Sequence, residues 1–261
     1  MNNRFLQGII KQIIFYFCLF LLWQFLFASK IWPEYLFPSP LKVLEAIING
    51  FSDRTFIIAL LVSLRRVLIG FGISIVLGAV FGVFIGRFKV FNETFGKLVM
   101  GIQTLPSICW FPLAILWFGL TEKTIVFIAV MGSVFSITIS VYSGIRNIPR
   151  IYLQTARNMG ARKIKMLWWV LIPAAAPSLI IGLKQGWSFA WRSLMAGELL
   201  FVSLGLGYLL MMGRELNDIS QVIAVIFIIM AISILIDKFI FGIIESKIKR
   251  RWGFERAEAW K

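Results

Sequence analysis

The sequence contains no histidine and few acidic residues. Its 261 residues include no His, 12 Asp and Glu, and 27 Lys and Arg. The lack of histidine excludes His-based proton relays and His metal sites. The two cysteines, Cys18 and Cys109, lie in apolar runs and give no indication of the redox compartment. A glycine-rich phosphate loop of the form GxxxxGK followed by Ser or Thr is also absent, so the chain is not expected to hydrolyse ATP itself.

Long apolar runs dominate what is present. Hydrophobic residues make up 59% of the sequence, above the roughly 45–50% that is typical of soluble domains. The sequence therefore predicts an all-α, polytopic membrane protein with a single transmembrane domain over residues 1–261. Each of six runs approaches the roughly 20 residues that cross a bilayer. The predicted spans are Gln12–Ala28, Val67–Gly86 (with an uncertain start, because Thr55–Leu64 is also apolar), Leu98–Phe118, Thr124–Ile145, Pro177–Leu200 and Val222–Ile244.

The chain has a net charge of +15, and its basic residues are unevenly distributed between the loops on the two sides of the predicted membrane. In a soluble protein it would suggest a nucleic-acid partner. In a membrane protein it is typical of cytoplasmic loops, so no nucleic acid is expected. Most of the charge lies in the two termini, in residues 87–97 and in residues 146–165. We therefore expect both termini and the largest internal loop, residues 146–173, on the cytoplasmic side. Arg65 and Arg66 lie at the outer edge of the second span. We interpret them as anchors at lipid headgroups, and attraction of anions toward the outer mouth is the alternative.

A short amphipathic helix is predicted after the first span. Ser39 can cap this helix, and Pro40 can occupy its first turn. Apolar residues then recur at helical spacing from Leu41 to Phe51. We expect the helix to lie on the outer surface of the membrane.

A stripe of small residues runs along the second predicted span, with one such residue every four positions. Small residues at this spacing form a groove into which another helix packs closely. The stripe therefore predicts a tightly packed bundle or dimer rather than a catalytic site. It consists of Gly70, Ser74, Gly78, Gly82 and Gly86.

The internal loop has the pattern of two short helices joined by a glycine turn. Pro149 can start the first helix, and Gly160 suits the left-handed position that ends it. Ala161–Ile172 predicts a second helix, and Pro173 and Pro177 are expected to break the chain before the fifth span. An ordinary positive-inside loop is the alternative interpretation. Against it, the length and the fixed turns predict a rigid knob.

This loop resembles the cytoplasmic "EAA" loop of permease subunits of ATP-binding-cassette (ABC) importers. That pattern is Glu-Ala-Ala, three residues, Gly, nine residues, Ile, one residue and Leu-Pro. Here it falls on Gln154-Thr155-Ala156, Gly160, Val170 and Ile172-Pro173, with every spacing kept. Gln154 replaces Glu and Thr155 replaces Ala. Further segments, such as FPSPLKVLEAI and GLKQGWSFAWRSLMAGELL, are similar to the branch that includes nitrate, sulfonate and taurine importers, and the similarity covers Leu36–Lys238.

The resemblance implies a type I ABC importer-like permease in the bacterial cytoplasmic (inner) membrane, surrounded by lipids. Two copies, expected to be identical, would form the pore, and an extracytoplasmic binding protein would deliver the substrate. Two cytoplasmic ATPase subunits would use ATP, so this chain is expected to bind no cofactor or metal and to be no enzyme. Each ATPase would receive one loop. The implied coupling residues are Gln154, Thr155, Ala156, Arg157, Met159, Gly160 and Ala161.

The fifth predicted span carries a polar stripe within about 140° of one helical face. Its members are Lys184, Gln185, Ser188, Arg192 and Glu198, with Trp187 and Trp191 at its border. A Lys or Arg in mid-membrane costs roughly 2.5–3.5 kcal/mol on insertion scales, so the stripe should not face lipid.

Two interpretations of the stripe remain open at this point. It lines the translocation pathway, with Arg192 attracting an anion and Glu198 gating or pairing, or it forms structural ion pairs. Asp237 in the sixth span is expected to cap or pair. Trp110 is a further pathway candidate, because Pro106 and Pro112 predict a kinked third span that lines a cavity. A packing role for Trp110 is the more common alternative.

The leading hypothesis is therefore the permease subunit of an ABC importer for a small anion such as a sulfonate, taurine or nitrate. The same role for a thiamine-precursor pyrimidine or another small organic molecule is the first alternative. A stand-alone carrier is less favoured, because the spans lack a clear set of carboxylates for ion coupling. A membrane scaffold that docks a cytoplasmic protein is the third hypothesis.

Overall fold

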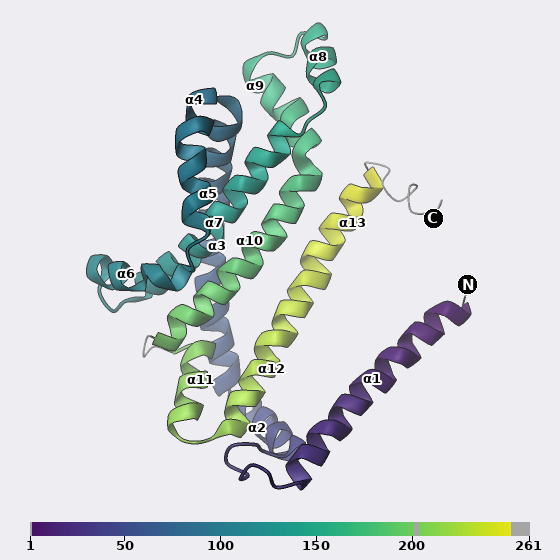
Figure 1. Cartoon of the computed structure of the whole chain (residues 1–261), viewed down its shortest axis with the longest axis vertical. Coiled ribbons are helices and arrows are strands. Elements are labelled where there is room, and N and C mark those ends of the chain that lie inside the picture. The colour runs from purple at the N-terminus through teal and green to yellow at the C-terminus, as the bar shows by residue number, and fades with distance from the viewer. Residues whose placement is uncertain (1, 201–203, 252–261) are drawn as a thin grey trace. The chain divides into compact units, whose positions relative to one another are not determined.

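The computed structural model describes residues 2–200 and 204–251, and every regular element in these ranges is helical (Figure 1). The apolar runs of the sequence form long helices because a backbone in hydrocarbon must satisfy its own hydrogen bonds. The elements are α1 (Asn2–Ala28), α2 (Pro40–Ser52), α3 (Thr55–Arg87), α4 (Lys89–Phe91), the π-helix η1 (Asn92–Gly96), α5 (Lys97–Gln103), the 3-10 helix η2 (Ser107–Trp110), α6 (Phe111–Phe118), α7 (Glu122–Arg146), α8 (Arg150–Asn158), α9 (Lys163–Met166), the π-helix η3 (Leu167–Leu171), α10 (Ile172–Leu200), α11 (Leu206–Glu215), α12 (Ile219–Ile236), the π-helix η4 (Asp237–Phe241) and α13 (Gly242–Arg251).

Five helical stretches of the described chain are long and apolar enough to cross a membrane, or six if the bent pair at the third predicted span counts as one. This number agrees with the six predicted spans. The second span begins at Thr55, which settles its start. The described residues separate into two compact units. One lies within residues 1–61 and 204–230, and the other within residues 62–203 and 231–261.

The first unit contains the predicted amphipathic helix, α2. The Ser39 side chain accepts a hydrogen bond from the backbone N–H of Lys42 at 3.3 Å, and Pro40 occupies the first turn, so the predicted cap is confirmed. The preceding connector is fixed by the Trp23 indole, which donates to the carbonyl of Pro38 at 3.1 Å. An ion pair between Lys42 and Glu34, at 2.9 Å, joins α2 to the same connector.

In the second unit, the small-residue stripe of α3 packs against α7 of the same chain. A Cβ atom built on Gly78 would lie 2.8 Å from Ile137, and one built on Gly82 would lie 2.5 Å from Val141. Polar contacts join the same two helices, because the Ser133 hydroxyl donates to the Ser74 hydroxyl at 2.7 Å. The predicted close packing is confirmed, and its partner is α7.

α7 and α10 also lie side by side along the second unit (Figure 1). Here glycine again permits the close approach. The positions of Gly182 and Gly186 on α10 leave no room for a Cβ, because side chains of Ser140 and Ile137 on α7 occupy that space. α7 is therefore the central helix of this unit, held between α3 and α10 by small-residue contacts.

The third predicted span is broken rather than simply kinked. The stretch Lys89–Gln103 meets Ser107–Phe118 at an angle of 103°. The break falls at residues 104–106, where Pro106 has no N–H to continue the helix and disfavours helical geometry at Leu105. Pro112 lies in the first turn of α6, where proline is tolerated. The sequence predicted the irregularity but not the size of the bend.

The prediction that Pro173 and Pro177 break the chain is wrong. η3 and α10 form one continuous candidate span over Leu167–Leu200, and Pro177 lies inside α10. The predicted second loop helix over Ala161–Ile172 is correspondingly divided between the short α9 and the π-helix η3. Prolines are tolerated within membrane helices where local π-helical adjustments satisfy the freed backbone groups, and η3 ends two residues before Pro173.

Replacing Gly82 by alanine should push α3 and α7 apart. The added Cβ would lie 2.7 Å from the carbonyl oxygen of Thr138 as well as against Val141. Overpacking of this kind costs about 1–3 kcal/mol, so thermal unfolding in detergent, followed by tryptophan fluorescence, should shift to lower temperature. Gly72→Ala on the same helix is the control, because nothing lies within 4 Å of its added Cβ. Equal shifts for the two variants would contradict the packing described here.

Candidate functional site

The three charged residues of α10, Lys184, Arg192 and Glu198, lie at three levels of the helix. The charge of Lys184, at the first level, is neutralised within the second unit. The Lys184 ammonium lies 3.0 Å from a carboxylate oxygen of Asp237 on η4 and 4.0 Å from one of Glu245 on α13. The expectation that Asp237 pairs is confirmed. This cluster ties α10 to the C-terminal helix, so Lys184 serves as a structural cation in this conformation.

Glu198, at the third level, is fully buried in an ion-pair network with α3. Its carboxylate accepts hydrogen bonds from the Ser63 hydroxyl at 2.7 Å and from the Arg66 guanidinium at 2.9 Å. Arg66 reaches further to Glu122 on α7 at 3.0 Å, and Arg65 pairs with the same carboxylate. Only 2% of the Arg66 side chain is exposed. The interpretation of Arg66 as a headgroup anchor is therefore wrong, because its side chain is buried against Glu198 of α10 rather than exposed to lipid headgroups.

Arg192 lies between these two levels and has no such compensation. Among the residues that the structure describes, no carboxylate lies within ion-pairing distance of its guanidinium. Its Nε donates to the carbonyl of Ser188 at 3.1 Å, and its guanidinium carbon lies 5.0 Å from the centre of the Phe189 ring. An arginine within an apolar span is costly unless it meets water, protein or an anion.

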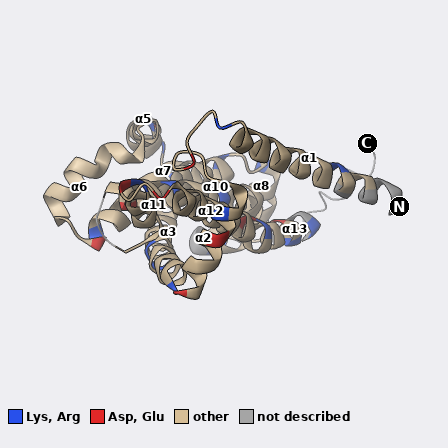
Figure 2. Cartoon of the chain, turned by 90° about the horizontal axis from the view of Figure 1, so that it is seen from below, with Lys and Arg blue, Asp and Glu red and all other residues tan. Residues whose placement is uncertain are grey.

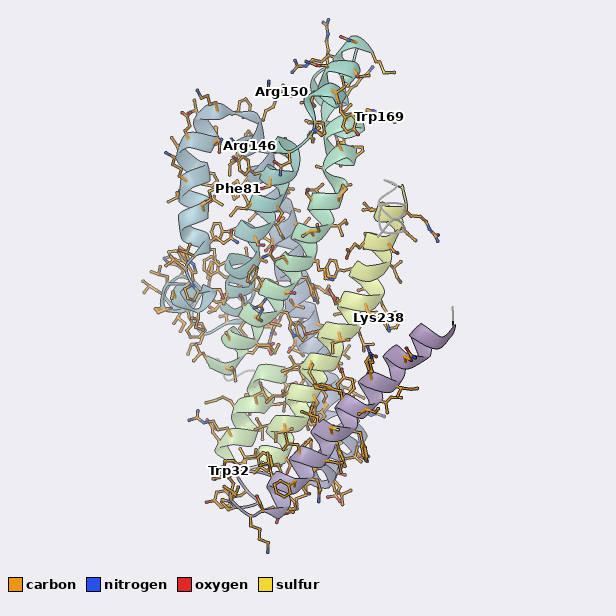
Figure 3. All side chains as sticks on the ribbon, turned by 45° about the vertical axis from the view of Figure 1, so that its right-hand side comes forward. Trp32, Phe81, Arg146, Arg150, Trp169 and Lys238 are labelled. Carbon is orange, nitrogen blue, oxygen red and sulfur yellow. The ribbon has the colours of Figure 1, made fainter. Side chains whose placement is uncertain are left out.

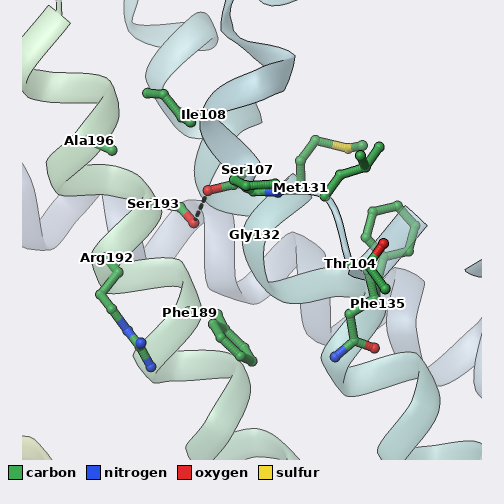
Figure 4. Close-up of a pocket in the computed structure, with 13 residues that line it drawn as sticks. Thr104, Ser107, Ile108, Met131, Gly132, Phe135, Phe189, Arg192, Ser193 and Ala196 are labelled. Atoms are coloured by element: carbon green, nitrogen blue, oxygen red, sulfur yellow. Dashed lines mark hydrogen bonds between the residues drawn. The ribbon is translucent and has the colours of Figure 1, made fainter. Parts of the chain in front are cut away.

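Arg192 lines a cavity of about 370 Å³ between α10, α7 and the break in the third span (Figure 4). The Ser107 and Ser193 hydroxyls are hydrogen-bonded across this cavity at 2.7 Å. The side-chain oxygen of Gln103 is buried there without a hydrogen-bond partner in the described structure. The lining residues are Gln103, Thr104, Leu105, Pro106, Ser107, Ile108, Met131, Gly132, Phe135, Phe189, Arg192, Ser193 and Ala196.

The remaining predicted pathway residues lie outside the cavity lining. Ser188 contributes its carbonyl to Arg192, one turn away. Trp191 is buried and stacks on Trp187, with ring centres 6.1 Å apart. Trp110 is half-buried on η2, next to the lining segment. The roles of these three residues in transport remain predictions.

Four polar lining residues were missed from the sequence: Gln103, Thr104, Ser107 and Ser193. The signal for the first three was polar character on both sides of Pro106, in the middle of an apolar run. Proline in a membrane span frees backbone groups, and irregular backbone at that depth is tolerated where it is buried in protein or lines a cavity. Ser193 gave no signal of its own, because serine is common at helix–helix contacts in membranes.

The loop after α7 has the predicted helix–glycine–helix geometry. α8 ends at Asn158, and Gly160, two residues further on, has a left-handed φ of 82°. The Ala161 N–H closes this end by donating to the carbonyl of Ala156 at 2.9 Å. Gln154 and Thr155 are exposed, and Met159 is 83% exposed, whereas Ala156 is buried. Figure 1 shows α8 and α9 projecting beyond the ends of α7 and α10.

Basic residues gather at this end of the second unit. The labelled Arg146, Arg150 and Trp169 lie there together with α8 and α9 (Figure 3). Figure 2 shows Lys and Arg on α13, whereas α6 is free of charge along its length. Arg146 and Arg150, which sequence analysis had assigned to one side of the membrane, therefore lie at the same end of the second unit.

Spans of this length and apolarity, one broken span and a protruding loop are the features of a multi-pass membrane protein. The chain belongs to the family described as "Binding-protein-dependent transport system inner membrane component", whose model matches residues 74–250. Its similarities place it in the branch of ABC importer permeases that includes those for nitrate, sulfonate and taurine. The chain is therefore a multi-pass component of the inner membrane.

Individual relatives agree with this assignment. An ABC transporter permease protein of Methanocaldococcus jannaschii is 34% identical over 68% of this chain and 67% of its own length. The nitrate import permease of Synechocystis is 27% identical over 78% of this chain and 77% of its own. The taurine transport system permease of Escherichia coli is 25% identical over 77% of this chain and 74% of its own.

A solved structure confirms the fold. The inward-facing MetNI methionine ABC transporter matches with a TM-score of 0.58 at 19% identity, covering 75% of this chain and 95% of that one. The predicted all-α bundle of the type I ABC importer permeases is therefore confirmed.

Truncation of Glu198 to alanine should destabilise the protein strongly, because it removes one of the two carboxylates on a buried arginine. Breaking a buried pair costs about 3–5 kcal/mol, and we expect the lower end because Glu122 remains. The double variant Arg66→Met/Glu198→Leu should recover most of the stability that Glu198→Ala loses. Lys89→Ala, which removes an exposed pair with Glu93, should change the unfolding temperature little. A double variant as unstable as Glu198→Ala would contradict this account of the network.

Proposed function

We propose that this chain is the pore-forming subunit of an ATP-driven importer of small oxyanions, of the nitrate or sulfonate kind. Two copies form the pore, a separate ATPase supplies the energy, and an extracytoplasmic protein delivers the anion. The relatives named for nitrate and taurine support this class of substrate. The family description, which specifies binding-protein-dependent transport, supports the delivery step.

The observation that carries the substrate class is the uncompensated Arg192 in the cavity. Lys184 and Glu198 on the same helix have ion partners, so Arg192 is the charged side chain of α10 that remains available to a ligand. Arg192 is also the only charged residue among the described residues that line the cavity. A guanidinium beside hydroxyl and amide groups suits a small oxyanion, because each can donate a hydrogen bond to an anionic oxygen.

The loop carries the proposed coupling to the ATPase. α8 presents exposed side chains, including Gln154, Thr155 and Met159, on a segment whose end is fixed by Gly160. Its basic surroundings support a cytoplasmic position for this end of the unit, with the chain termini on the same side. Each loop, held by one of the two closing ATPase subunits, would transmit their motion because the open and closed states make different contacts with it.

A neutral aromatic substrate is the second candidate. Phe135 and Phe189 line the same cavity and could stack against a small organic ring such as a pyrimidine. This candidate predicts that transport does not depend on the charge of Arg192. The test of the first candidate therefore decides between the two.

Removal of the charge at Arg192 should weaken import of an anion. With the permease, its ATPase and its binding protein in proteoliposomes, we expect Arg192→Gln to lower the ATP-dependent rate of nitrate or taurine uptake at limiting substrate by about tenfold or more. A charged hydrogen bond contributes about 1.5–3 kcal/mol. Arg192→Lys should retain much of the uptake because it keeps the charge. Full uptake by Arg192→Gln would contradict the anion site and favour the neutral substrate.

A β-branched residue at Gly160 should uncouple the loop. Gly160→Val places valine at a φ of 82°, which costs about 1–3 kcal/mol of backbone strain, so α8 should lose its fixed end. We expect the co-expressed ATPase no longer to co-purify in mild detergent. Gly160→Asn is the matched control, because asparagine tolerates the left-handed conformation. Co-purification that is unchanged in Gly160→Val would show that ATPase binding does not depend on this turn.

A further inference from the structure

A second polar pocket lies at the basic end of the second unit, away from the cavity of Arg192. It has a volume of about 320 Å³ and is lined by Arg87, Arg157, Ala161, Arg162 and Met166. The three arginines come from separate parts of the chain. Arg87 is the last residue of α3, Arg157 belongs to α8, and Arg162 lies between α8 and α9. Three arginines from separate parts of the chain therefore line one concave site.

No acidic side chain of the described structure neutralises this site. None of the ion pairs or side-chain hydrogen bonds of the described residues involves Arg87, Arg157 or Arg162. The sequence contains no Asp or Glu from residue 123 to residue 197, so the loop cannot supply a carboxylate of its own. Like charges held together without a counterion repel each other, and a bound anion relieves that repulsion.

The chemistry of arginine narrows the class of anion. The planar guanidinium fork matches phosphate and carboxylate oxygens bidentately, and several forks together favour a group with more than two acceptor oxygens. A phosphate group meets that requirement. The volume of the pocket accommodates a phosphate with a small substituent.

The neighbouring tryptophans indicate where such a phosphate would come from. Trp168 and Trp169 on η3 are 62% and 80% exposed, and tryptophan is enriched at the interface between membrane and water. Arg162 precedes Trp168 by six residues, and α9 and the start of η3 join the two. The pocket thus lies on the polar side of the interfacial tryptophans, within reach of the headgroup layer.

We infer that Arg87, Arg157 and Arg162 form a binding site for a phosphate group, supplied by the headgroup of an anionic phospholipid. The inference rests on the proposed function only in placing this end of the unit at the cytoplasmic membrane surface. A lipid held by α3 and α8 together would brace the coupling helix against the bilayer. Basic pockets at the cytoplasmic ends of membrane helices bind anionic headgroups by this chemistry.

The test measures lipid binding to the purified full chain by native mass spectrometry, without ATPase or substrate. Dissociation constants are compared for dioleoyl-phosphatidylglycerol and dioleoyl-phosphatidylcholine. The pocket variant is Arg87→Gln/Arg157→Gln/Arg162→Gln. The matched control, Lys97→Gln/Arg150→Gln/Lys165→Gln, removes the same charge from side chains at this end that do not line the pocket. Unfolding temperatures establish that both variants fold.

We expect the wild-type chain to prefer phosphatidylglycerol, the control to keep that preference, and the pocket variant to lose it. Each arginine near an anionic headgroup contributes about fivefold in affinity. Arg162→Gln alone, compared with Arg150→Gln alone, should therefore weaken phosphatidylglycerol binding by about fivefold, and this pair decides the matter if the triple variant does not fold.

Inorganic phosphate, added at constant ionic strength, distinguishes the two sources of the ligand. Lipid binding that withstands millimolar phosphate supports the phospholipid headgroup, and displacement supports a site for free phosphate. Equal losses in the pocket and control variants would overturn the inference, because only overall charge would then matter. ATPase association is measured separately, by co-purification. If the pocket variant loses the ATPase while its lipid binding is unchanged, the inference is overturned and the arginines are assigned to carboxylates of the ATPase. Failure of anion transport would leave these results unaffected.

Discussion

A charge within an apolar span must be paired or must face something polar, and α10 carries three charged residues within its length. Lys184 is held by Asp237 and Glu245, and Glu198 is held by Arg66 and Ser63. These contacts tie α10 to the C-terminal helices at one level and to α3 at another. Arg192, between the two levels, is left beside a cavity. The same constraint thus stabilises the unit and leaves one cation available to a ligand.

Close helix packing places that cation where it can act. Glycines on α3 and α10 allow both helices to approach α7, so the second unit has little room for a ligand between its straight helices. Space opens where the third span breaks at Pro106, and the freed segment faces α10 with Gln103 and Ser107. The cavity therefore results from a proline break set against a tightly packed pair. At the basic end, the loop and the three-arginine pocket follow directly from the ends of α3, α7 and α10.

Features with a local cause could be predicted from the sequence. The spans follow from apolar length, the α2 cap from Ser39 and Pro40, and the end of α8 from Gly160. The family pattern also located the loop. Features that depend on distant partners could not be predicted. Arg66 gave no sign of Glu198, and the polar stripe of α10 did not show which of its charged residues would lack an ion partner. The prolines before α10 were misjudged because membrane helices re-satisfy the backbone groups that proline frees.

The central claim is that the cavity beside Arg192 belongs to the substrate path. The most direct measurement is the reactivity of a single cysteine at Thr104, in a chain with Cys18→Ala and Cys109→Ala, toward a membrane-impermeant thiol reagent in the assembled transporter. A cysteine at buried Ser136 on α7 is the control. The account predicts that Thr104→Cys reacts, that the transported anion slows the reaction, and that Ser136→Cys does not react. A Thr104→Cys variant that is inert, or that reacts at a rate the anion does not change, would contradict it.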